Sequence, residues 1–279
     1  MADSTSPSLT QLAKRAAFFA SLFGLDAKRV VALRHAARFW RDCWQYYRSA
    51  RDTSFPLRVA ALSPVLTDFD TQAGVVRGHY FHQDLWAARK IFARNPATHL
   101  DIGSRIDGFV AHLLTFMPVS VVDIRPLTST VAGLTFVRGN CLDLNWIASD
   151  SVDSLSSLHA VEHFGLGRFG DPLDPTAWHL GMRELARVLR PGGRLYFSVP
   201  IGRERVEFNA HRVFNPRTVL TTFADLELLS FSSIDESGEL HADSQPAGFD
   251  DVGYACGLFE YTKKPTGRTD PEPTATSAH

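Results

Sequence analysis

Residues 185–195, LARVLRPGGRL, join the end of one element to the start of another. Apolar residues recur at helical spacing from Trp178 to Leu189, which predicts a helix over that range. Pro191, Gly192 and Gly193 then interrupt the pattern, as in a tight turn. The apolar run at 194–199 that follows predicts a buried strand. The stretch therefore indicates a helix that leads through a turn into a strand.

The same alternation extends in both directions from this stretch. Helical patterns occupy 84–92 and 108–116, and the residues around them predict strands at 98–103, 119–123, 134–138, 152–158, 226–234 and 255–262. Strands that alternate with helices predict an α/β fold with a doubly wound, mostly parallel sheet of seven strands. The last strand follows a loop and has no helix after it, so we expect it to pair antiparallel.

The composition divides the chain into three parts. Residues 1–75 are predicted to form an α-helical N-terminal extension, residues 76–262 the α/β domain, and residues 263–279 a Pro-rich disordered tail. Residues 1–60 carry ten Lys or Arg and four Asp or Glu, whereas the remainder carries 19 and 26. The basic, aromatic extension is expected to pack as an accessory layer, and an oligomer contact or a peripheral membrane contact stays open.

Whole-chain composition excludes several classes of protein. The 279 residues are 44% hydrophobic and 21% charged, as in a soluble globular protein, and no apolar window reaches the ~18 residues of a membrane span. The three cysteines are far apart and predict neither a disulfide framework nor a metal cluster, which favours a cytoplasmic location. The chain as a whole is not basic, so nucleic-acid binding is not expected.

Polar residues follow the first three predicted strands, at the sheet edge where α/β proteins bind ligands. Asp101 and Gly103 end the first strand, and Gly103 allows a sharp turn and a close approach by a ligand. Asp123 ends the second, where a carboxylate can bind both hydroxyls of a ribose. Asn140 and Cys141 follow the third and could contact the edge of a base.

Together these motifs resemble the class I, Rossmann-like S-adenosylmethionine-dependent methyltransferases over residues 78–262. The resemblance is carried by LDIGS at 100–104, VVD at 121–123, GNCLDL at 139–144, LHAVEH at 158–163 and the stretch 185–195. Residues 78–86, GHYFHQDLW, and 208–212, FNAHR, look like a bacterial branch catalogued as a domain of unknown function. That narrower resemblance implies an acceptor among sugars or polysaccharide precursors.

The resemblance implies S-adenosylmethionine as cofactor and a set of binding residues. Asp101 and Gly103 would lie near its methionine part, Asp123 at the ribose, and Asn140 with Cys141 at the adenine, and Ser104 and His159 complete the predicted set. The chain departs from the family pattern in the first loop, where Arg105 and Asp107 replace glycines, and at Asn140, where an acidic residue is usual. Tyr80, His82 and Gln83 precede the first strand, where the resemblance implies a lid over the cofactor.

A nicotinamide-dependent sugar oxidoreductase is another interpretation of the loop that follows the first strand. Its fingerprint, G-x-G-x-x-G, positions a pyrophosphate on a helix N-terminus. Residues 103–108, GSRIDG, lack the middle glycine and place Asp107 where a phosphate would approach. A positively charged sulfonium tolerates nearby carboxylates, so the loop favours the methyl donor.

Methyl transfer to a hydroxyl of a small molecule or glycan also needs a base for the hydroxyl proton. His159, after the fourth strand, is the first choice, and His211, on the loop after the fifth, is the second. Glu162 either takes part in catalysis or only orients the helix that follows. No metal ligands are assigned. A noncatalytic protein that kept the fold and binds the cofactor or a partner is the alternative, motivated by Arg105, Asp107 and Asn140.

Overall fold

The computed structural model describes residues 21, 23–24, 26–50 and 53–264, and the chain divides into two compact units between Val75 and Val76. Residues 1–20 of the predicted α-helical extension and the tail from residue 265 lie outside the described residues. Of the helices described, none is long and apolar enough to cross a membrane.

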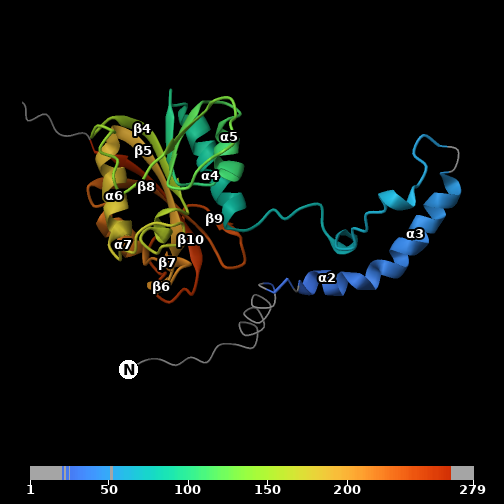
Figure 1. The fold of residues 1–279 in the computed structure, drawn as a ribbon. Helices are drawn as coiled ribbons and strands as arrows, with labels where there is room; N and C mark the ends of the chain where they lie inside the picture. Colours follow the sequence, from blue (N-terminus) through green and yellow to red (C-terminus); the bar gives the residue numbers. More distant parts are fainter. Residues whose placement is uncertain (1–20, 22, 25, 51–52, 265–279) are drawn as a thin grey trace, which may run out of the picture. The chain divides into compact units, whose positions relative to one another are not determined.

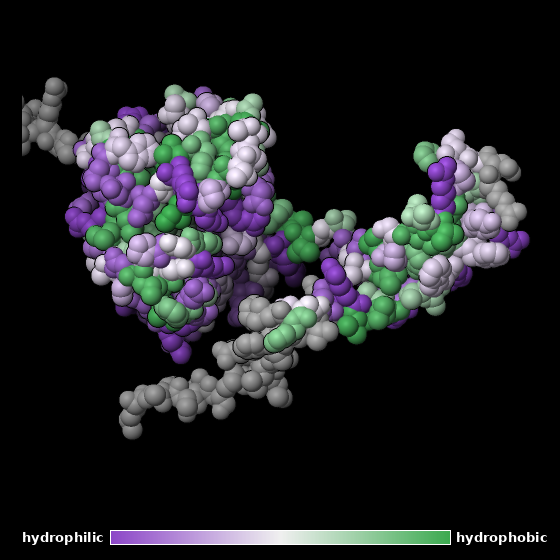
Figure 2. Space-filling view, in the orientation of Figure 1, coloured by the Kyte–Doolittle hydropathy of each residue, from purple (hydrophilic) through white to green (hydrophobic). Residues whose placement is uncertain are grey.

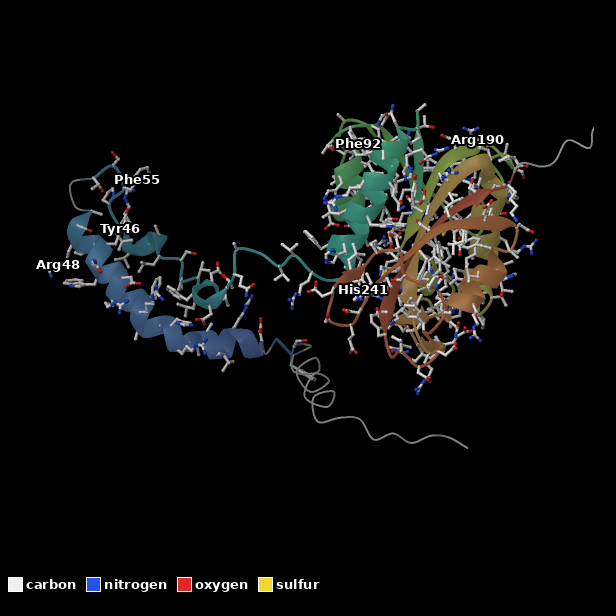
Figure 3. The ribbon with its side chains drawn as sticks, turned by 180° about the vertical axis from the view of Figure 1, so that it is seen from behind. Tyr46, Arg48, Phe55, Phe92, Arg190 and His241 are labelled. Atoms are coloured by element: carbon white, nitrogen blue, oxygen red, sulfur yellow. The ribbon has the colours of Figure 1, made fainter. Side chains whose placement is uncertain are left out.

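The first unit contains the α2 helix (Ala27–Ala32), a 3-10 turn (Leu33–His35) and the α3 helix (Ala36–Ser49), followed by 3-10 turns at Val59–Ala61 and Asp68–Asp70. Tyr46 on α3 donates its hydroxyl to the Phe55 carbonyl at 3.0 Å and so holds the following loop (Figure 3). None of the described α3 side chains is buried, and Trp40 and Trp44 are about 60% exposed. Hydrophobic residues consequently appear along this unit in Figure 2. The accessory layer, the oligomer contact and the membrane contact stay predictions.

The second unit is built on one twisted sheet whose strands follow the order β3-β2-β1-β4-β5-β10-β8-β9 (Figure 1). The first five are parallel, and β10 pairs antiparallel with both β5 and β8. Their bounds are β1 His99–Ile102, β2 Val119–Asp123, β3 Leu134–Arg138, β4 Val152–Leu158, β5 Leu189–Ile201, β8 Leu226–Ile234, β9 Leu240–His241 and β10 Ala255–Lys263. The predicted doubly wound, mostly parallel sheet with an antiparallel last strand is confirmed, and the two-residue β9 adds an eighth strand at the edge.

Helices cover both faces of this sheet (Figure 1). On one face lie α4 (His79–Arg94), a π-helical turn (Ile106–Val110) and α5 (Ala111–Leu113), and on the other α6 (Ala177–Val188) and α7 (Pro216–Thr222). The apolar stripe of α4 buries Trp86, Ala87 and Ile91, and that of α6 buries Met182, Leu185 and Val188. Each large aliphatic side chain buried in this way contributes about 1.5–3 kcal/mol. Two separate cores therefore hold the sheet between the helix layers.

The stretch 185–195 forms the predicted helix and strand, but the turn between them is part of β5. Gly192 has a φ of 73°, and a Cβ at Gly193 would lie 2.9 Å from the Arg190 carbonyl oxygen. The pairing of β4 with β5 shifts register at this point, between Val152 and Ser154. The two glycines thus make a bulge that lets the strand begin directly at the end of α6. A small hairpin of β6 (Arg205–Glu207) and β7 (His211–Val213) follows β5.

Candidate functional site

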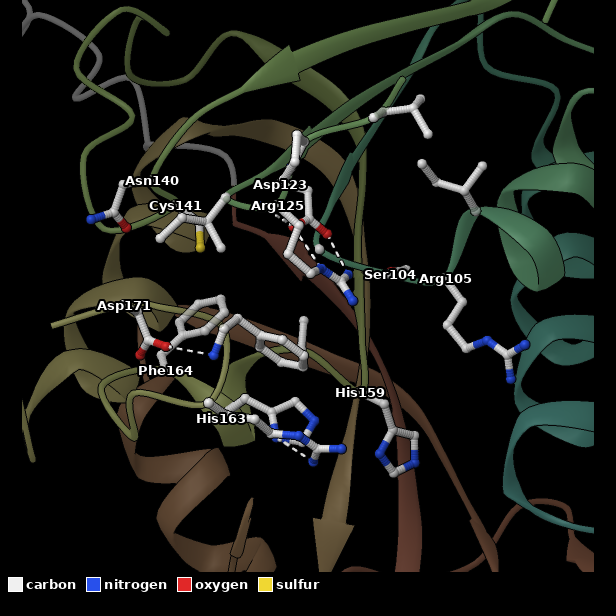
Figure 4. A pocket seen from close by; sticks show the side chains of 18 of the residues that line it. Ser104, Arg105, Asp123, Arg125, Asn140, Cys141, His159, His163, Phe164 and Asp171 are labelled. Atoms are coloured by element: carbon white, nitrogen blue, oxygen red, sulfur yellow. Dashed lines mark hydrogen bonds and ion pairs between the residues drawn. The ribbon is translucent and has the colours of Figure 1, made fainter. Parts of the chain in front are cut away.

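A cavity of about 650 Å³ lies at the carboxyl ends of β1, β2, β3 and β4, the edge at which open parallel sheets bind ligands (Figure 4). Its wall is built from the loops that follow these strands and from residues 163–171. Several of the predicted site residues line it together: Tyr80, Gly103, Ser104, Asp123, Asn140, Cys141 and His159. The other predicted site residues, His82, Gln83, Asp101, Glu162 and His211, lie outside the cavity wall.

The loop after β1 is held by a buried hydrogen-bond network. Asp101 is 0% exposed and accepts hydrogen bonds from the Ser104 backbone at 3.0 Å, the Ser104 hydroxyl at 2.6 Å and the Ser156 hydroxyl at 2.5 Å. Burial raises the pKa of Asp101 to about 6. Gly103 has a φ of 74°, and a Cβ there would lie 3.0 Å from Ala160 Cβ. Asp101 therefore shapes the loop from beneath, while Gly103 and Ser104 face the cavity.

Asp123 ends β2 at the cavity wall and is paired with Arg125 (Figure 4). Its Oδ1 accepts from the Arg125 backbone N–H at 2.8 Å and from Nε at 2.9 Å, and its Oδ2 accepts from Nη2 at 2.5 Å. The Arg125 guanidinium also lies 4.7 Å from the centre of the Phe169 ring. The carboxylate predicted to hold a ribose is therefore already engaged by a guanidinium fork.

Asn140 and Cys141 line the far wall of the cavity, at the end of β3 (Figure 4). The Asn140 side-chain oxygen accepts from the Leu142 backbone N–H at 3.0 Å, as in an Asx turn. Burial raises the pKa of the Cys141 thiol to about 12, so the thiol stays protonated at neutral pH. These residues offer the cavity an amide and a neutral sulfur, which suit a polar, uncharged ring.

His159 and Glu162 form a buried pair at the end of β4. His159 has a φ of 49°, a conformation rare for residues other than glycine, and its backbone N–H donates to the Ser198 carbonyl at 3.0 Å. Its Nδ1 lies 2.7 Å from Glu162 Oε1. Its Nε2 is buried and has no hydrogen-bond partner among the described residues. Burial alone would lower the pKa of His159, but the Cys256 sulfur and the Glu162 carboxylate raise it above the usual value.

Two further histidines, His163 and His211, lie near His159 and make other contacts. His163 lines the cavity, and its Nδ1 lies 2.7 Å from the Ala210 carbonyl oxygen. His211 starts β7, and its Nε2 is 3.6 Å from Glu207 Oε2. Burial lowers the pKa of His211. His211 therefore lies next to His163, with 6.5 Å between their ring centres, and does not line the cavity.

Of the three residues expected to form a lid, only Tyr80 reaches the cavity. Its ring lies 4.9 Å from the Arg105 guanidinium and 5.4 Å from the His159 ring. Gln83 is buried and accepts from the Ser198 hydroxyl at 2.5 Å, which ties α4 to β5. The Nε2 of His82 is buried without a hydrogen bond to any residue that the structure describes. The first turn of α4 is thus partly cavity wall and partly core.

The sequence prediction missed the cationic and aromatic part of the cavity. Arg125, Arg168, Phe164 and Phe169 all line it. Arg125 could have been found, because it stands two residues after Asp123 at a strand end. The Pro-rich loop that begins at Phe169 could be expected to border the pocket from its sequence, but the places of Arg168 and Phe169 depend on Asp171, which accepts from the Gly165 backbone N–H at 2.7 Å. That contact also makes Asp171 a loop-forming residue.

Comparisons with known proteins bear on part of the chain. The family profile described as "Caenorhabditis protein of unknown function, DUF268" matches residues 142–247. The match is to a domain of unknown function, and the expected bacterial branch is not confirmed by it. Among curated proteins none matches.

Several solved structures are similar to the chain. The N-methyltransferase NodS from Bradyrhizobium japonicum, in complex with S-adenosyl-L-homocysteine, is 15% identical, with 67% of this chain and 88% of that one covered and a TM-score of 0.46. The 1,6-didemethyltoxoflavin-N1-methyltransferase of Burkholderia thailandensis is 18% identical, with 83% and 90% covered and a TM-score of 0.47. The [4+2]-cyclase SpnF is 13% identical, with 66% and 82% covered and a TM-score of 0.46.

Proposed function

We propose that this chain is an S-adenosylmethionine-dependent methyltransferase that methylates a hydroxyl of a small molecule or a glycan. The observation that carries the proposal is that one cavity is lined both by the acidic side chain at the end of β2 and by the His159 ring, which Glu162 holds at the end of β4. A group that can hold a ribose and a group that can take a proton therefore face the same space. A polysaccharide-precursor acceptor and a cytoplasmic location remain predictions of the sequence.

The residues present fit this cofactor. The cavity volume lies within the ~300–1,000 Å³ usual for small-molecule sites. A carboxylate has about four lone-pair sites and Arg125 uses three of them, so Asp123 can still accept from one ribose hydroxyl. Asp107, at the start of the π-helical turn, places a negative charge where a dinucleotide would need phosphate-binding groups. A sulfonium cofactor avoids that conflict, because it carries no phosphate.

The chemistry divides between cofactor and protein. S-Adenosylmethionine supplies an electrophilic methyl group on a positive sulfur, and the leaving group is a neutral thioether. The raised pKa of His159 favours the imidazolium, so the base is the neutral form that higher pH populates, and its Nε2 accepts the proton of the acceptor hydroxyl as the new carbon–oxygen bond forms. Glu162 accepts the Nδ1 hydrogen bond of His159, which fixes the tautomer and stabilises the imidazolium. Tyr80 packs beside this imidazole and helps to exclude water.

Calorimetric titration with S-adenosylmethionine and S-adenosylhomocysteine tests the cofactor. Wild-type protein is expected to bind both, and Asp123→Asn is expected to weaken binding about 10–100-fold, because one charged hydrogen bond contributes about 1.5–3 kcal/mol. Asp107→Asn is the matched control, since this cavity carboxylate is paired with Arg105 and has no assigned contact with the cofactor. Binding of a nicotinamide dinucleotide in place of the sulfonium compounds would contradict the proposal.

One observation favours the noncatalytic alternative, namely that Arg125 engages both oxygens of Asp123. If this pair closes the ribose site permanently, wild-type protein binds no cofactor and Arg125→Met gains binding. If the pair opens or leaves room, wild-type protein binds and the Arg125→Met substitution changes affinity only a few-fold. The comparison of these two proteins in one titration separates the candidates.

A further inference from the structure

A cluster of two histidines and a cysteine lies beside the cavity. His79 is the first residue of α4, His159 follows β4, and Cys256 is the second residue of β10. One possible ligand atom from each, two ring nitrogens and a sulfur, lie within 4.8 Å of one another. Sheet topology brings them together, because β10 pairs with β5, and β5 lies beside β4.

The side chains around the cluster hold the two imidazoles in the way that metal-binding histidines are held. His159 Nδ1–H donates to Glu162 Oε1 at 2.7 Å, which leaves the buried and unpartnered Nε2 as its ligand atom within the described structure. His79 is hydrogen-bonded to the backbone of Asp235. Metal-binding histidines almost always use their second nitrogen for such a contact with a carboxylate or a carbonyl. Both imidazoles of the cluster meet that condition.

Packing also limits how the cluster can move. The His79 ring is stacked between the rings of His159, 5.8 Å away, and Tyr254, 5.3 Å away. Cys256 is 0% exposed, and the hydrogen bond of its thiol is a long contact of 3.8 Å to the Gly257 carbonyl. A buried imidazole nitrogen without a hydrogen-bond partner is costly, and His159 Nε2 is such an atom among the described residues. A bound ion would satisfy this nitrogen and would replace the weak hydrogen bond of the thiol.

We propose that His79, His159 and Cys256 form a Zn²⁺ site with an open fourth position. Two imidazole nitrogens and one thiolate are the donor set that favours zinc over magnesium or calcium. Tetrahedral zinc separates such donors by about 3.3–3.8 Å, as follows from Zn–N and Zn–S bonds of about 2.0–2.3 Å. Donor atoms up to 4.8 Å apart therefore need to approach one another by about 1 Å when zinc binds. On binding, Cys256 loses its proton to solvent and its sulfur bonds to the metal.

The first experiment measures zinc alone, on full-length protein without an affinity tag and after chelator treatment. Wild-type protein is expected to bind one Zn²⁺ per chain, and Cys256→Ser and His79→Gln are each expected to weaken binding about 100-fold. Cys43→Ser and His179→Gln are the matched controls, because they remove a thiol and an imidazole far from the cluster in sequence and are expected to leave zinc binding unchanged. Circular dichroism verifies that each variant is folded, and His79, which is half-buried, is the less disruptive of the two ligand positions.

A second readout identifies the sulfur ligand directly. Co²⁺ bound at this site is expected to show sulfur-to-cobalt charge-transfer absorption that Cys256→Ser abolishes and Cys43→Ser retains. Glu162→Gln is expected to weaken zinc binding about 10–100-fold, because it removes the partner of a ligand rather than the ligand. No stoichiometric zinc on folded wild-type protein, or zinc that binds equally well to Cys256→Ser and His79→Gln, would overturn the proposal.

The zinc site also bears on the proposed function, and this step rests on that function. Nε2 of His159 has one lone pair, so it cannot bind zinc and accept a proton at the same time. Zinc is therefore expected to inhibit methyl transfer, and chelation is expected to restore it. The binding titrations need neither cofactor nor acceptor, so a failure of the zinc site and a failure of the methyltransferase assignment give different results.

Discussion

His99 and His159 are both buried in the same sheet, yet their surroundings make them different chemical groups. His99 begins β1, and its Nδ1 and Nε2 lie 2.8 Å from the hydroxyls of Ser154 and Ser156 on β4. His159 follows β4 and uses only Nδ1, toward Glu162, whereas its Nε2 is unpartnered within the described part of the chain. A histidine with two satisfied nitrogens supports the fold, and one with a free buried nitrogen is available for a proton or a metal.

The largest expected effect is on catalysis. His159→Gln is expected to lower methyl transfer by about 10²–10⁴-fold, the usual contribution of a general base, with cofactor affinity nearly unchanged. Transfer from a labelled methyl donor to a panel of hydroxylated acceptors measures this. His99→Gln is the matched control, expected to keep the rate per folded molecule. Equal losses in both variants would remove the distinction between the two histidines.

The second effect is on the pH dependence of stability. Burial lowers the pKa of His99 to about 3, well below its unfolded value of about 6.5. As pH falls, His99 therefore gains a proton in the unfolded chain before it does so in the folded protein. The contribution of neutral His99 to the free energy of unfolding is complete above pH 6.5 and is lost toward pH 3, at about 1.4 kcal/mol per pH unit. Urea unfolding measures the free energy of unfolding of wild type and of His99→Gln. The difference between these two free energies should shrink by about 2–3 kcal/mol from pH 6.5 to pH 4.5.

The effect of His99 is measured as the difference between wild type and His99→Gln, because Asp101 changes the free energy of unfolding with pH in the opposite direction. Burial raises its pKa to about 6, so its contribution is complete below its unfolded pKa near 4 and is lost as pH rises toward 6. Wild-type stability is therefore expected to change little from these two groups between pH 4 and pH 6. If the free energies of unfolding of wild type and His99→Gln differ by a constant amount across this range, His99 does not titrate as expected.

Ser156 tests how strongly the network beneath β1 is coupled. Its hydroxyl donates to Asp101 and also lies 2.8 Å from His99 Nε2, so Ser156→Ala leaves that nitrogen without a partner and removes one of the three hydrogen bonds to Asp101. The expected loss is about 1–3 kcal/mol in the free energy of unfolding, measured by urea denaturation at pH 7. Ser157→Ala removes a single hydrogen bond, to the Ile102 carbonyl, and should cost about 1 kcal/mol. A larger loss from Ser157→Ala would disprove the coupling.

Gly103 tests the cavity end of the same strand. Gly103→Ala places a side chain at a φ of 74° and 3.0 Å from Ala160 Cβ, so about 1–3 kcal/mol of stability and some cofactor affinity should be lost. Gly192 has a φ of 73° with nothing within 4 Å of its Cβ position, so Gly192→Ala reports the backbone cost alone, about 1 kcal/mol. Equal melting curves for the two variants would show that the contact with Ala160 is unimportant.

The sequence predicted the strands of the sheet better than its helices. The predicted strands 119–123, 134–138 and 152–158 have the observed bounds, because short apolar runs between turn residues leave little freedom. The predicted helix at 84–92 begins earlier, at His79, and the helix predicted at 108–116 is a π-helical turn followed by the three-residue α5. Lys263, expected in the tail, belongs to β10 and donates to the Ala186 carbonyl at 2.9 Å. These differences depend on contacts that a local pattern does not contain.

The candidate site was predictable to the extent that it lies at strand ends. Gly103, Asp123, Asn140 and His159 follow parallel strands, and parallel strands end at one edge, so their meeting at a cavity follows from the order of elements. The partners of these residues were not predictable. Glu162 was placed near His159 by sequence, but Arg125 on Asp123 and Cys256 beside His159 depend on side-chain directions and on strand pairing.

The amino-acid sequence by itself determined the order of helices and strands, the mostly parallel sheet and the edge at which polar residues gather, because hydrophobic period and turn residues act locally. Only the tertiary structure decided which nitrogen of His159 is used, that both oxygens of Asp123 are engaged, and that residues 79, 159 and 256 meet. Those facts depend on register and packing between segments up to 177 positions apart, and the chain brings such segments together only when the whole sheet is formed.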